Sequence, residues 1–463
     1  MKAQALFAVV SALQLAVVAN AEGLNPRHVA KRQNAVSTPA ASSSASVSAS
    51  ATASVVAPAT GTAPPPLASG TGVPPLSSIS SGMPTRTAKA AATTYTPGSK
   101  PPIAGAPPLP NPIVPGSAVY PPVDKIPPTD SPEVKEWLKE LEGHNIPDLA
   151  PTTDGSCGAD PDKAADAANR GWWSCGGHTR DTDIVACPDK LTWGVSFDDG
   201  PSDYIRFKHV HMLYVLDYLK EKDLSATFFV VGSRITQRPA LLIEEYMAGH
   251  EISVHTWSHS KALTSLTNAE LVAELGWTRK IIKDVLGVSP TTMRPPWGDI
   301  DDRVRAVSLA MGMVPIIWSR SPSGNTFDTN DWQVAGGKVS GADSFNTFST
   351  ILQQASQMET GFIVLQHDLF ETTVDLAVGY TLDAALNHNP KFNLKAIGQC
   401  QRIPATNLYV ETNTNKTFPY PSANGSKANN RSGAVIALAP GSGKMAVLSA
   451  LAGAALGVMG FLL

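Results

Sequence analysis

Two adjacent carboxylates, Asp198 and Asp199, stand where an apolar run ends and a Gly-Pro pair begins. Residues 191–197 are typical of a buried strand, and Gly200-Pro201 is typical of the turn that ends it. Neighbouring strand residues point to opposite faces, so the two carboxylates can share one role only if the backbone bends there. Taken alone, the pair is typical of a turn that happens to hold two aspartates, because short motifs often arise by chance.

Three histidines give this pair a chemical context. His255 and His259 follow a β-rich run with HxxxH spacing, and His367 follows the last apolar run. Two imidazoles and one carboxylate suit Zn²⁺ or another borderline divalent ion, with coordination positions left open for water and substrate. HxxxH also arises by chance on helix surfaces. Here it follows a β-rich run, so a chance origin would require a separate coincidence.

The elements that must position these side chains alternate along residues 183–397. Apolar runs predict strands at 191–197, 226–231, 251–255, 313–318 and 361–367. Helical patterns predict helices at 205–222, 240–248, 268–286, 301–311 and 343–358. Such alternation favours parallel strands with crossover helices, either as a small β/α barrel or as a doubly wound sheet.

Polar residues cluster after four of the five predicted strands and after the helix predicted at 268–286. In barrel enzymes the chemistry lies where strands end. The clusters are Asp198-Asp199, His255–His259, Arg294–Gly298, Asp328–Trp332 and Leu365–Asp368.

Five ordered motifs in these clusters resemble the polysaccharide deacetylases with a NodB homology domain. This is carbohydrate esterase family four, and the resemblance is strongest to its fungal chitin deacetylases. It covers residues 183–403, about half of the chain. One such motif would be weak evidence, whereas five in order are strong. The motifs are Ser196–Pro201 (TFDDGP type), His255–His259, Arg294–Gly298 (R-P-P-x-G), Asp328–Trp332 (D-x-x-D-W) and Leu365–His367 (L-x-H).

The resemblance implies a fold of the α/β class, a distorted (β/α) barrel with fewer than eight strands, and it assigns roles. Asp198 would be the catalytic base, and Asp199 would join His255 and His259 on Zn²⁺ or Co²⁺. Arg294 would orient Asp198, and Asp331 would orient the acid, His367. The backbone N–H of Trp297 would bind the oxyanion, while Trp332 and Leu365 would line the pocket for the acetyl methyl.

The residues by themselves leave simpler readings open. Asp331 and Arg294 could be members of structural ion pairs. Trp332 and Leu365, taken singly, are more often core than pocket. The departures from the family pattern are small, Ser196 for Thr and Trp297 for Tyr. The segment 318–328 is longer than the family's usual link, which affects the placing of the fourth motif.

The beginning of the chain carries signals of secretion. Met1-Lys2, an apolar run to Val18 and Ala19-Asn20-Ala21 predict a signal peptide at 1–21. Residues 22–131 are rich in Ser, Thr, Ala and Pro, and we expect a disordered, O-glycosylated stalk or a plain linker there. Residues 132–182 are expected to pack on the barrel as an N-terminal extension, and the resemblance implies a NodB-type domain at 183–403.

The C-terminal region carries glycosylation and anchor signals. We expect a glycosylated linker at 404–432 with N-linked sites at Asn415, Asn424 and Asn430. Small residues around Ser432, a spacer and an apolar stretch match a glycosylphosphatidylinositol (GPI) attachment signal, with 433–463 as the propeptide. The protein would then be held at the outer face of the plasma membrane or in the cell wall. Whether it is later transferred to wall glucan stays open.

Four cysteines fit an oxidising compartment, and they allow three pairings between which the sequence does not choose. Cys187 and Cys400 bracket the catalytic region, so a bond between them would tie its ends together and leave Cys157 with Cys175. The net charge of −3 argues against general affinity for nucleic acid. We expect a monomer.

The leading hypothesis is therefore a secreted, metal-dependent chitin deacetylase that acts on chitin or its oligomers. A second hypothesis keeps the fold and the metal but changes the substrate to acetylated xylan or peptidoglycan. A third is a wall structural protein that binds sugar without turnover, and the complete set of metal ligands, base and acid argues against it.

Overall fold

A computed structural model of the chain describes residues 73–83, 93–114, 119–204 and 214–415. The predicted signal peptide (1–21), Asn424, Asn430, Ser432 and the propeptide 433–463 lie outside the described residues, and Asn415 is the last residue inside them. No helix in the described ranges is long and apolar enough to cross a membrane.

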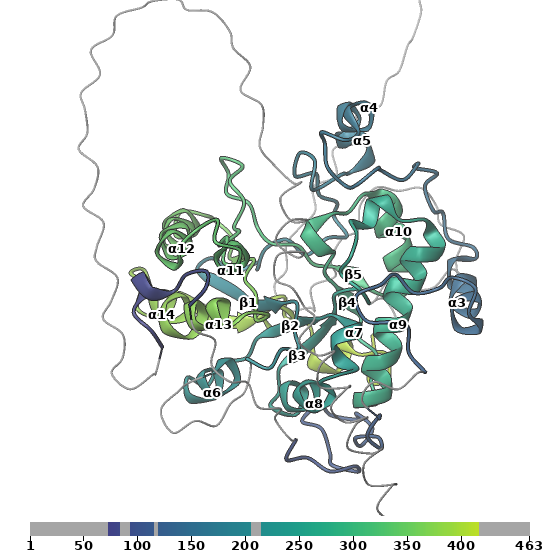
Figure 1. Ribbon diagram of the computed structural model, residues 1–463, viewed down its shortest axis with the longest axis horizontal. Helices are drawn as coiled ribbons and strands as arrows, with labels where there is room; N and C mark the ends of the chain where they lie inside the picture. Colours follow the sequence, from purple (N-terminus) through teal and green to yellow (C-terminus); the bar gives the residue numbers. More distant parts are fainter. Residues whose placement is uncertain (1–72, 84–92, 115–118, 205–213, 416–463) are drawn as a thin grey trace, which may run out of the picture. The chain divides into compact units, whose positions relative to one another are not determined.

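The core is one parallel sheet whose strands alternate with helices along the chain (Figure 1). Its order is β5-β4-β3-β2-β1-β6, and β7 pairs with the first half of β1, whose second half pairs with β2. Parallel neighbours need crossover connections, and helices supply them here. The strands are β1 (Thr192–Asp198), β2 (Thr227–Val230), β3 (Glu251–Val254), β4 (Thr292–Met293), β5 (Val314–Pro315), β6 (Phe362–Ile363) and β7 (Asn393–Ala396).

Helices precede β1 in the extension and then connect successive strands. Those of the extension are α3 (Pro132–Trp137), α4 (Pro161–Ala165) and α5 (Ala167–Arg170). Those between β1 and β5 are α6 (Val215–Glu221), α7 (Gly232–Ile235), α8 (Pro239–Met247), α9 (Asn268–Leu286) and α10 (Asp302–Ala310). The remainder are α11 (Trp332–Ala335), α12 (Gly341–Ala355), α13 (Glu371–Leu376), α14 (Leu382–Leu386) and α15 (Ile397–Cys400).

An irregular segment joins the two outer strands of the sheet. After β5, the Ser319 N–H donates to the Ile363 carbonyl oxygen at 3.0 Å. The Leu365 N–H donates to the Phe327 carbonyl at 2.9 Å, and the Thr329 N–H donates to the Leu365 carbonyl at 3.2 Å. These bonds connect the chain that leaves β5 to the chain that leaves β6. The predicted distorted (β/α) barrel with fewer than eight strands is confirmed in the described residues.

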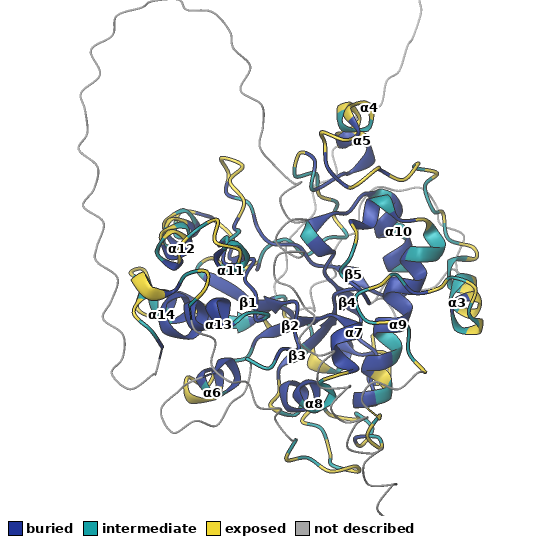
Figure 2. Ribbon diagram, viewed as in Figure 1, coloured by how far each residue is buried: buried dark blue, intermediate teal, exposed yellow. Residues whose placement is uncertain are grey.

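The longest helix, α9, shows why the sequence folds as it does. Thr267 and Glu270 make both halves of a capping box, and Gly287 ends the helix at φ 81°, a left-handed conformation that glycine adopts readily. The apolar stripe of α9 is fully buried, like the strands it covers (Figure 2). Each such leucine or isoleucine contributes about 1.5–3 kcal/mol of burial free energy. The helix is therefore a rigid support for the loop that follows β3.

Part of the segment predicted to be disordered packs on the barrel, so that prediction is wrong for residues 73–83, 93–114 and 119–131. Ile79 is fully buried, and its carbonyl oxygen accepts the Gly341 N–H at 2.8 Å. Tyr120 stacks on Trp257 with ring centroids 6.2 Å apart. The composition argument failed because it counts only the apolar surface that a segment carries, whereas these residues pack on surface that the barrel supplies.

The folded region also continues past residue 403, so the predicted linker is wrong for 404–415. Tyr409 is fully buried, and its hydroxyl accepts the Ile252 N–H at 3.0 Å. The Thr291 N–H donates to the Leu408 carbonyl at 3.0 Å. These contacts fasten the segment beside β3 and β4.

The extension packs against α9, and the structure pairs the four cysteines in the same way as the tentative prediction. Cys187 is bonded to Cys400, and Cys157 to Cys175. Glu140 of the extension forms an ion pair with Arg279 on α9, with an N–O distance of 2.5 Å. The first disulfide ties the start of β1 to α15, and the second closes the extension on itself.

The predicted strands and helices differ from the observed ones mainly at their ends. The strands predicted at 313–318 and 361–367 shorten to β5 and β6, because the backbone leaves the ladder there to join the irregular segment. The helix predicted at 205–222 is α6 in its described part. Strands β4 and β7 were not predicted, because two-residue and mixed-polarity strands carry almost no periodic signal.

Candidate active site

Three buried side chains that follow β1 and β3 meet at one point. The Asp199 Oδ1 lies 3.2 Å from the His259 Nε2 and 3.5 Å from the His255 Nε2. One ligand atom from each residue lies within 4.8 Å of the other two. The structure thus brings together the three residues that the sequence predicted as metal ligands.

The two adjacent aspartates share this site because the backbone turns between them. Asp198 is the last residue of β1, and Asp199 has a φ of 79°. Asp198 Oδ2 consequently lies only 3.8 Å from the Nε2 of His255. Thr256, His259 and Trp297 also have positive φ, between 49° and 64°. Strained backbone that gathers in one place is typical of a functional site.

Asp199 has the properties of a metal ligand. Burial opposes ionisation of its carboxyl, but His259, Arg234 and other nearby charges hold its pKa below the usual range. Arg234 donates to the Asp199 carbonyl oxygen, and its guanidinium nitrogen lies 3.7 Å from Oδ1. That Oδ1 is buried without a hydrogen-bond partner among the described residues. A charged oxygen that accepts no hydrogen bond and lies beside two imidazoles fits a divalent cation.

The tautomer of His255 is also suited to metal binding. Its Nδ1 lies 2.8 Å from the Arg294 carbonyl oxygen, so Nδ1 carries the hydrogen and Nε2 keeps its lone pair. Burial, with the charge of His259, lowers the pKa of His255 well below its ordinary value, and burial also lowers the pKa of His259. These shifts favour the neutral imidazole, which is the form in which histidine binds a metal ion.

The loop that carries the two histidines is anchored by Glu274 of α9. The Glu274 carboxylate accepts the backbone N–H groups of Trp257 and Ser258 at 2.8 Å each, and the Ser258 hydroxyl at 2.5 Å. The Trp257 indole N–H donates to the Pro122 carbonyl at 3.1 Å. The loop is thus fixed by hydrogen bonds to α9 and to the N-terminal segment around Pro122.

Replacing Glu274 by alanine should weaken metal binding. The change removes the acceptor of two buried backbone N–H groups and of the Ser258 hydroxyl. It loosens the loop that orients both imidazoles, so we expect an affinity loss of about 10–100-fold. Competition with a chromophoric chelator measures it. Glu270→Ala, an exposed change on the same helix, should remove only the helix cap, at about 1 kcal/mol of stability. Equal metal affinities in the two variants would contradict this role.

Asp198 is held by Arg294 opposite the histidines. The Arg294 Nη1 donates to the Asp198 Oδ1 at 2.6 Å and to the Ser196 hydroxyl at 3.0 Å. The guanidinium also lies 3.9 Å from the centroid of the Phe229 ring. Burial raises the pKa of Asp198 to about 6, although Arg294 and His367 oppose the rise. A carboxyl of this kind can take up a proton near neutral pH.

His367 is clamped by Asp331 as the fourth motif predicted. One Asp331 oxygen lies 2.7 Å from the His367 Nδ1, and the other accepts its backbone N–H at 2.8 Å. Burial alone would lower the pKa of His367, but the charge and hydrogen bond of Asp331, with Asp199 and Asp198, raise it to about 10. The raised pKa favours the protonated imidazolium, a form that can donate a proton.

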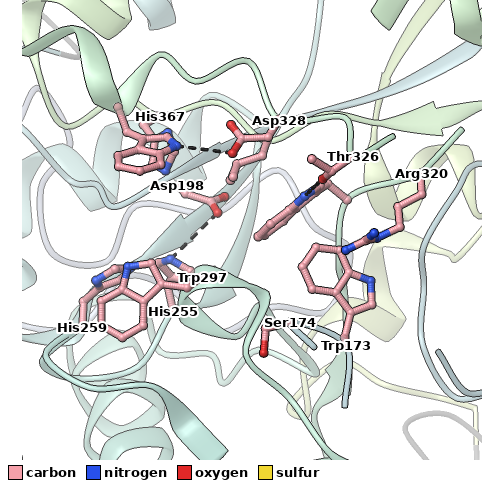
Figure 3. A pocket seen from close by; sticks show the side chains of 13 residues that line it. Trp173, Ser174, Asp198, His255, His259, Trp297, Arg320, Thr326, Asp328 and His367 are labelled. Atoms are coloured by element: carbon pink, nitrogen blue, oxygen red, sulfur yellow. Dashed lines mark hydrogen bonds and ion pairs between the residues drawn. The ribbon is translucent and has the colours of Figure 1, made fainter. Parts of the chain in front are cut away.

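The three predicted pocket residues line one cavity with Asp198 and the histidines (Figure 3). Trp297 lies in the short turn Pro296–Gly298, 4.9 Å from the His259 ring between centroids. Trp332 donates from its indole to Asp328 at 3.4 Å. Leu365 is buried on the same wall. The three side chains form an apolar niche beside Asp198 and the histidines.

One side of this cavity was not predicted from the sequence. The residues on that side are Trp173, Ser174, Trp318, Arg320 and Thr326, and Asp328 also lines the cavity. Two features of the sequence could have indicated this side of the cavity. They are the adjacent tryptophans Trp172 and Trp173 beside Cys175, and the added length of segment 318–328. Arg234 and Glu274 were missed too, because arginine and glutamate on helices are usually solvent-facing.

The chain is similar to several known proteins. Residues 185–316 match the sequence profile of the family described as polysaccharide deacetylase. Chitin deacetylase 1 of Cryptococcus neoformans var. grubii serotype A is 49% identical over 343 residues, which are 73% of this chain and 70% of that protein. A peptidoglycan-N-acetylglucosamine deacetylase, PgdA of Listeria monocytogenes, is 34% identical over 39% of this chain and 33% of its own length.

Among solved structures, the chitin deacetylase of Colletotrichum lindemuthianum is similar at a TM-score of 0.42 and 23% identity. The match covers 50% of this chain and 95% of that one.

Proposed function

This chain belongs to the polysaccharide deacetylase family, and we propose that it is a metal-dependent hydrolase of the N-acetyl groups of chitin. One observation carries the proposal. A carboxylate held by Arg294 and an imidazole held by Asp331 flank a three-ligand cluster, inside a pocket with an apolar niche. Amide hydrolysis needs a base, a separate acid and charge stabilisation, and this arrangement offers all three.

Asp198 takes a proton from the attacking water, and the oxygen adds to the acetyl carbonyl carbon. Asp199, His255 and His259 would hold the divalent ion, which when bound lowers the pKa of water from about 15.7 to about 7. The backbone N–H of Trp297 donates to the oxyanion. The imidazolium of His367 then protonates the sugar nitrogen as the C–N bond breaks, because an amide anion cannot leave. The products are acetate and a free amine on the sugar.

The preferred substrate is proposed to be chitin rather than another acetylated glycan. The name of the 49% identical relative supports this choice, and Trp332 and Leu365 fit the acetyl methyl. The runner-up substrates are acetylated xylan, whose acetyl groups are esters, and peptidoglycan, on which the Listeria relative is named to act.

An extracellular location at the cell wall is also proposed. Two disulfides support an oxidising compartment, and the fungal relative supports a wall substrate. The GPI anchor at Ser432 and the N-linked glycans stay sequence predictions.

Acetate release tests the function. The purified full chain is incubated with N-acetylglucosamine oligomers and, separately, with acetylated xylan, before and after treatment with a chelator. We expect release from the oligomers, loss of release after chelation, and recovery on addition of Zn²⁺ or Co²⁺. Faster release from xylan would favour the ester substrate. Oligomer binding without any release would support a non-catalytic wall protein.

A further inference from the structure

A short part of the N-terminal segment, residues 120–124, lies against the loop that carries the two candidate histidine ligands. Tyr120 stacks on Trp257 with ring centroids 6.2 Å apart and ring planes at 24°. The Pro122 carbonyl oxygen accepts the Trp257 indole N–H at 3.1 Å. Trp257 stands between the two histidines in the sequence, and its side chain is fully buried. We call residues 120–124 the brace.

The barrel encloses the Trp257 ring on its other sides. A Cβ added at Gly232 of α7 would come within 2.7 Å of that ring. Trp277 on α9 meets it edge to face, with centroids 6.2 Å apart. The Trp257 carbonyl oxygen accepts the Ser233 N–H at 3.0 Å. Tyr120 completes the enclosure, and because packed interiors leave little free space, the ring cannot turn without displacing the loop.

The brace also reaches the support of Asp199. The Asp124 N–H donates to the Ser233 hydroxyl at 3.3 Å, and that hydroxyl donates to the Asp124 carboxylate at 3.4 Å. Ser233 is followed on α7 by Arg234, which donates to the Asp199 carbonyl oxygen. Asp199 has a φ of 79°, a conformation that persists only when its surroundings hold it. The brace thus contacts elements that support all three candidate ligands.

The brace is itself fixed to α9. The Tyr120 hydroxyl donates to Asp284 at 2.8 Å, and the Lys280 ammonium lies 5.8 Å from the centroid of the Tyr120 ring. Lys280 and Asp284 form an ion pair at 2.6 Å, so the three side chains make one connected group on the helix. The Tyr120 ring also meets Trp277, with centroids 6.4 Å apart. A ring held in this way restricts the movement of Trp257.

We propose that the brace positions the metal ligands and raises the affinity of the site for a divalent ion, with Tyr120 as its main positioning residue. Groups that orient metal ligands commonly change the affinity by about 10–100-fold. The inference rests on the proposed function only in taking Asp199, His255 and His259 as the ligands. It adds to the metal site a segment whose Pro122 lies 135 residues before Trp257 in the chain.

The Zn²⁺ affinity of Tyr120→Ala tests the brace. In the purified full chain, competition with a chromophoric chelator should show about tenfold weaker binding than in the wild type, because the loop loses the ring that packs on Trp257. Tyr120→Phe keeps that ring and removes only the hydroxyl that donates to Asp284, so it should bind Zn²⁺ nearly as tightly as the wild type. Tyr95→Ala removes another half-buried tyrosine of the N-terminal segment and should leave the affinity unchanged.

Ser233→Ala tests the brace through its other contact, and it decides alone if melting curves show that Tyr120→Ala does not fold. It removes the hydroxyl that binds Asp124 and should weaken Zn²⁺ binding about threefold, the usual effect of one hydrogen bond. Wild-type affinity in Ser233→Ala and in every folded Tyr120 variant would overturn the proposal. Equal losses in Tyr95→Ala and Tyr120→Ala would also overturn it, because the effect would then be general loosening of the segment.

Metal binding is measured without substrate, so this inference and the proposed function fail separately. The expected affinity losses, with no acetate release by the wild type, would sustain the brace and overturn the deacetylase. Normal acetate release by the wild type, with unchanged Zn²⁺ affinity in the brace variants, would overturn the brace alone.

Discussion

Replacing Asp198 by asparagine should lower kcat for acetate release by about 10²–10⁴-fold, the usual contribution of a general base. Asparagine keeps the size of the side chain and can still accept from Arg294, but its amide cannot accept the proton of the attacking water. The cluster of Asp199, His255 and His259 is untouched, so the metal should stay bound. Acetate release from N-acetylglucosamine oligomers at saturating metal is the measurement.

Asp203→Asn is the matched control, since it is the same change a few residues further along the chain. Asp203 pairs with Arg238 at 2.8 Å and has no part in the cluster. Its activity should equal that of the wild type. If Asp198→Asn retained even a tenth of the wild-type kcat, Asp198 would not be the base.

Replacing His367 by glutamine should have an effect that depends on the leaving group. Hydrolysis of the sugar amide should fall by about 10²–10⁴-fold, because the departing nitrogen must be protonated. Hydrolysis of 4-nitrophenyl acetate should fall much less, because the phenolate leaves without a proton. Comparison of kcat for the two substrates measures the difference. Equal losses on both substrates would show that His367 is not the acid.

Asp331→Asn should move the alkaline limb of the pH profile to lower pH. Asp331 contributes to the raised pKa of His367, which lies at about 10, so its removal lowers that pKa. The acid must be protonated to act, and activity is lost as pH rises through its pKa. The variant should therefore lose activity at a lower pH than the wild type, as profiles of kcat would show. An unmoved limb would remove His367 from the role of titrating acid.

The candidate metal cluster could be predicted because Asp199 and His255 directly follow strands, and His259 lies four residues after His255. In a parallel sheet the carboxyl ends of the strands meet at one edge, so His255 and His367 had to approach Asp198 once β1, β3 and β6 were aligned. Ordered motifs along the chain then identified the residues. The fold followed from the same alternation of apolar runs and helical patterns.

The convergence of Asp198 and Asp199 could not be predicted from strand periodicity. Alternation places neighbouring side chains on opposite faces, and only the positive φ of Asp199 turns its carboxylate toward His259. A backbone dihedral at a single residue leaves no trace in a hydropathy pattern.

Contacts between residues that are distant in sequence could not be predicted either. Trp173 reaches the cavity from the extension, and Trp257 is braced by Pro122 from a segment whose composition suggested disorder. Glu274 lies on α9 among residues that alternate as in any amphipathic helix. Such partners are decided by tertiary packing, which local patterns do not encode.

The number of divalent ions bound per chain in Asp198→Asn and in Asp199→Ala tests the central claim most directly. The claim is that these neighbours divide into a base and a metal ligand. After equal loading and desalting, elemental analysis should find about one ion per chain in Asp198→Asn and close to none in Asp199→Ala. Loss of the ion from Asp198→Asn, or its retention in Asp199→Ala, would contradict this division.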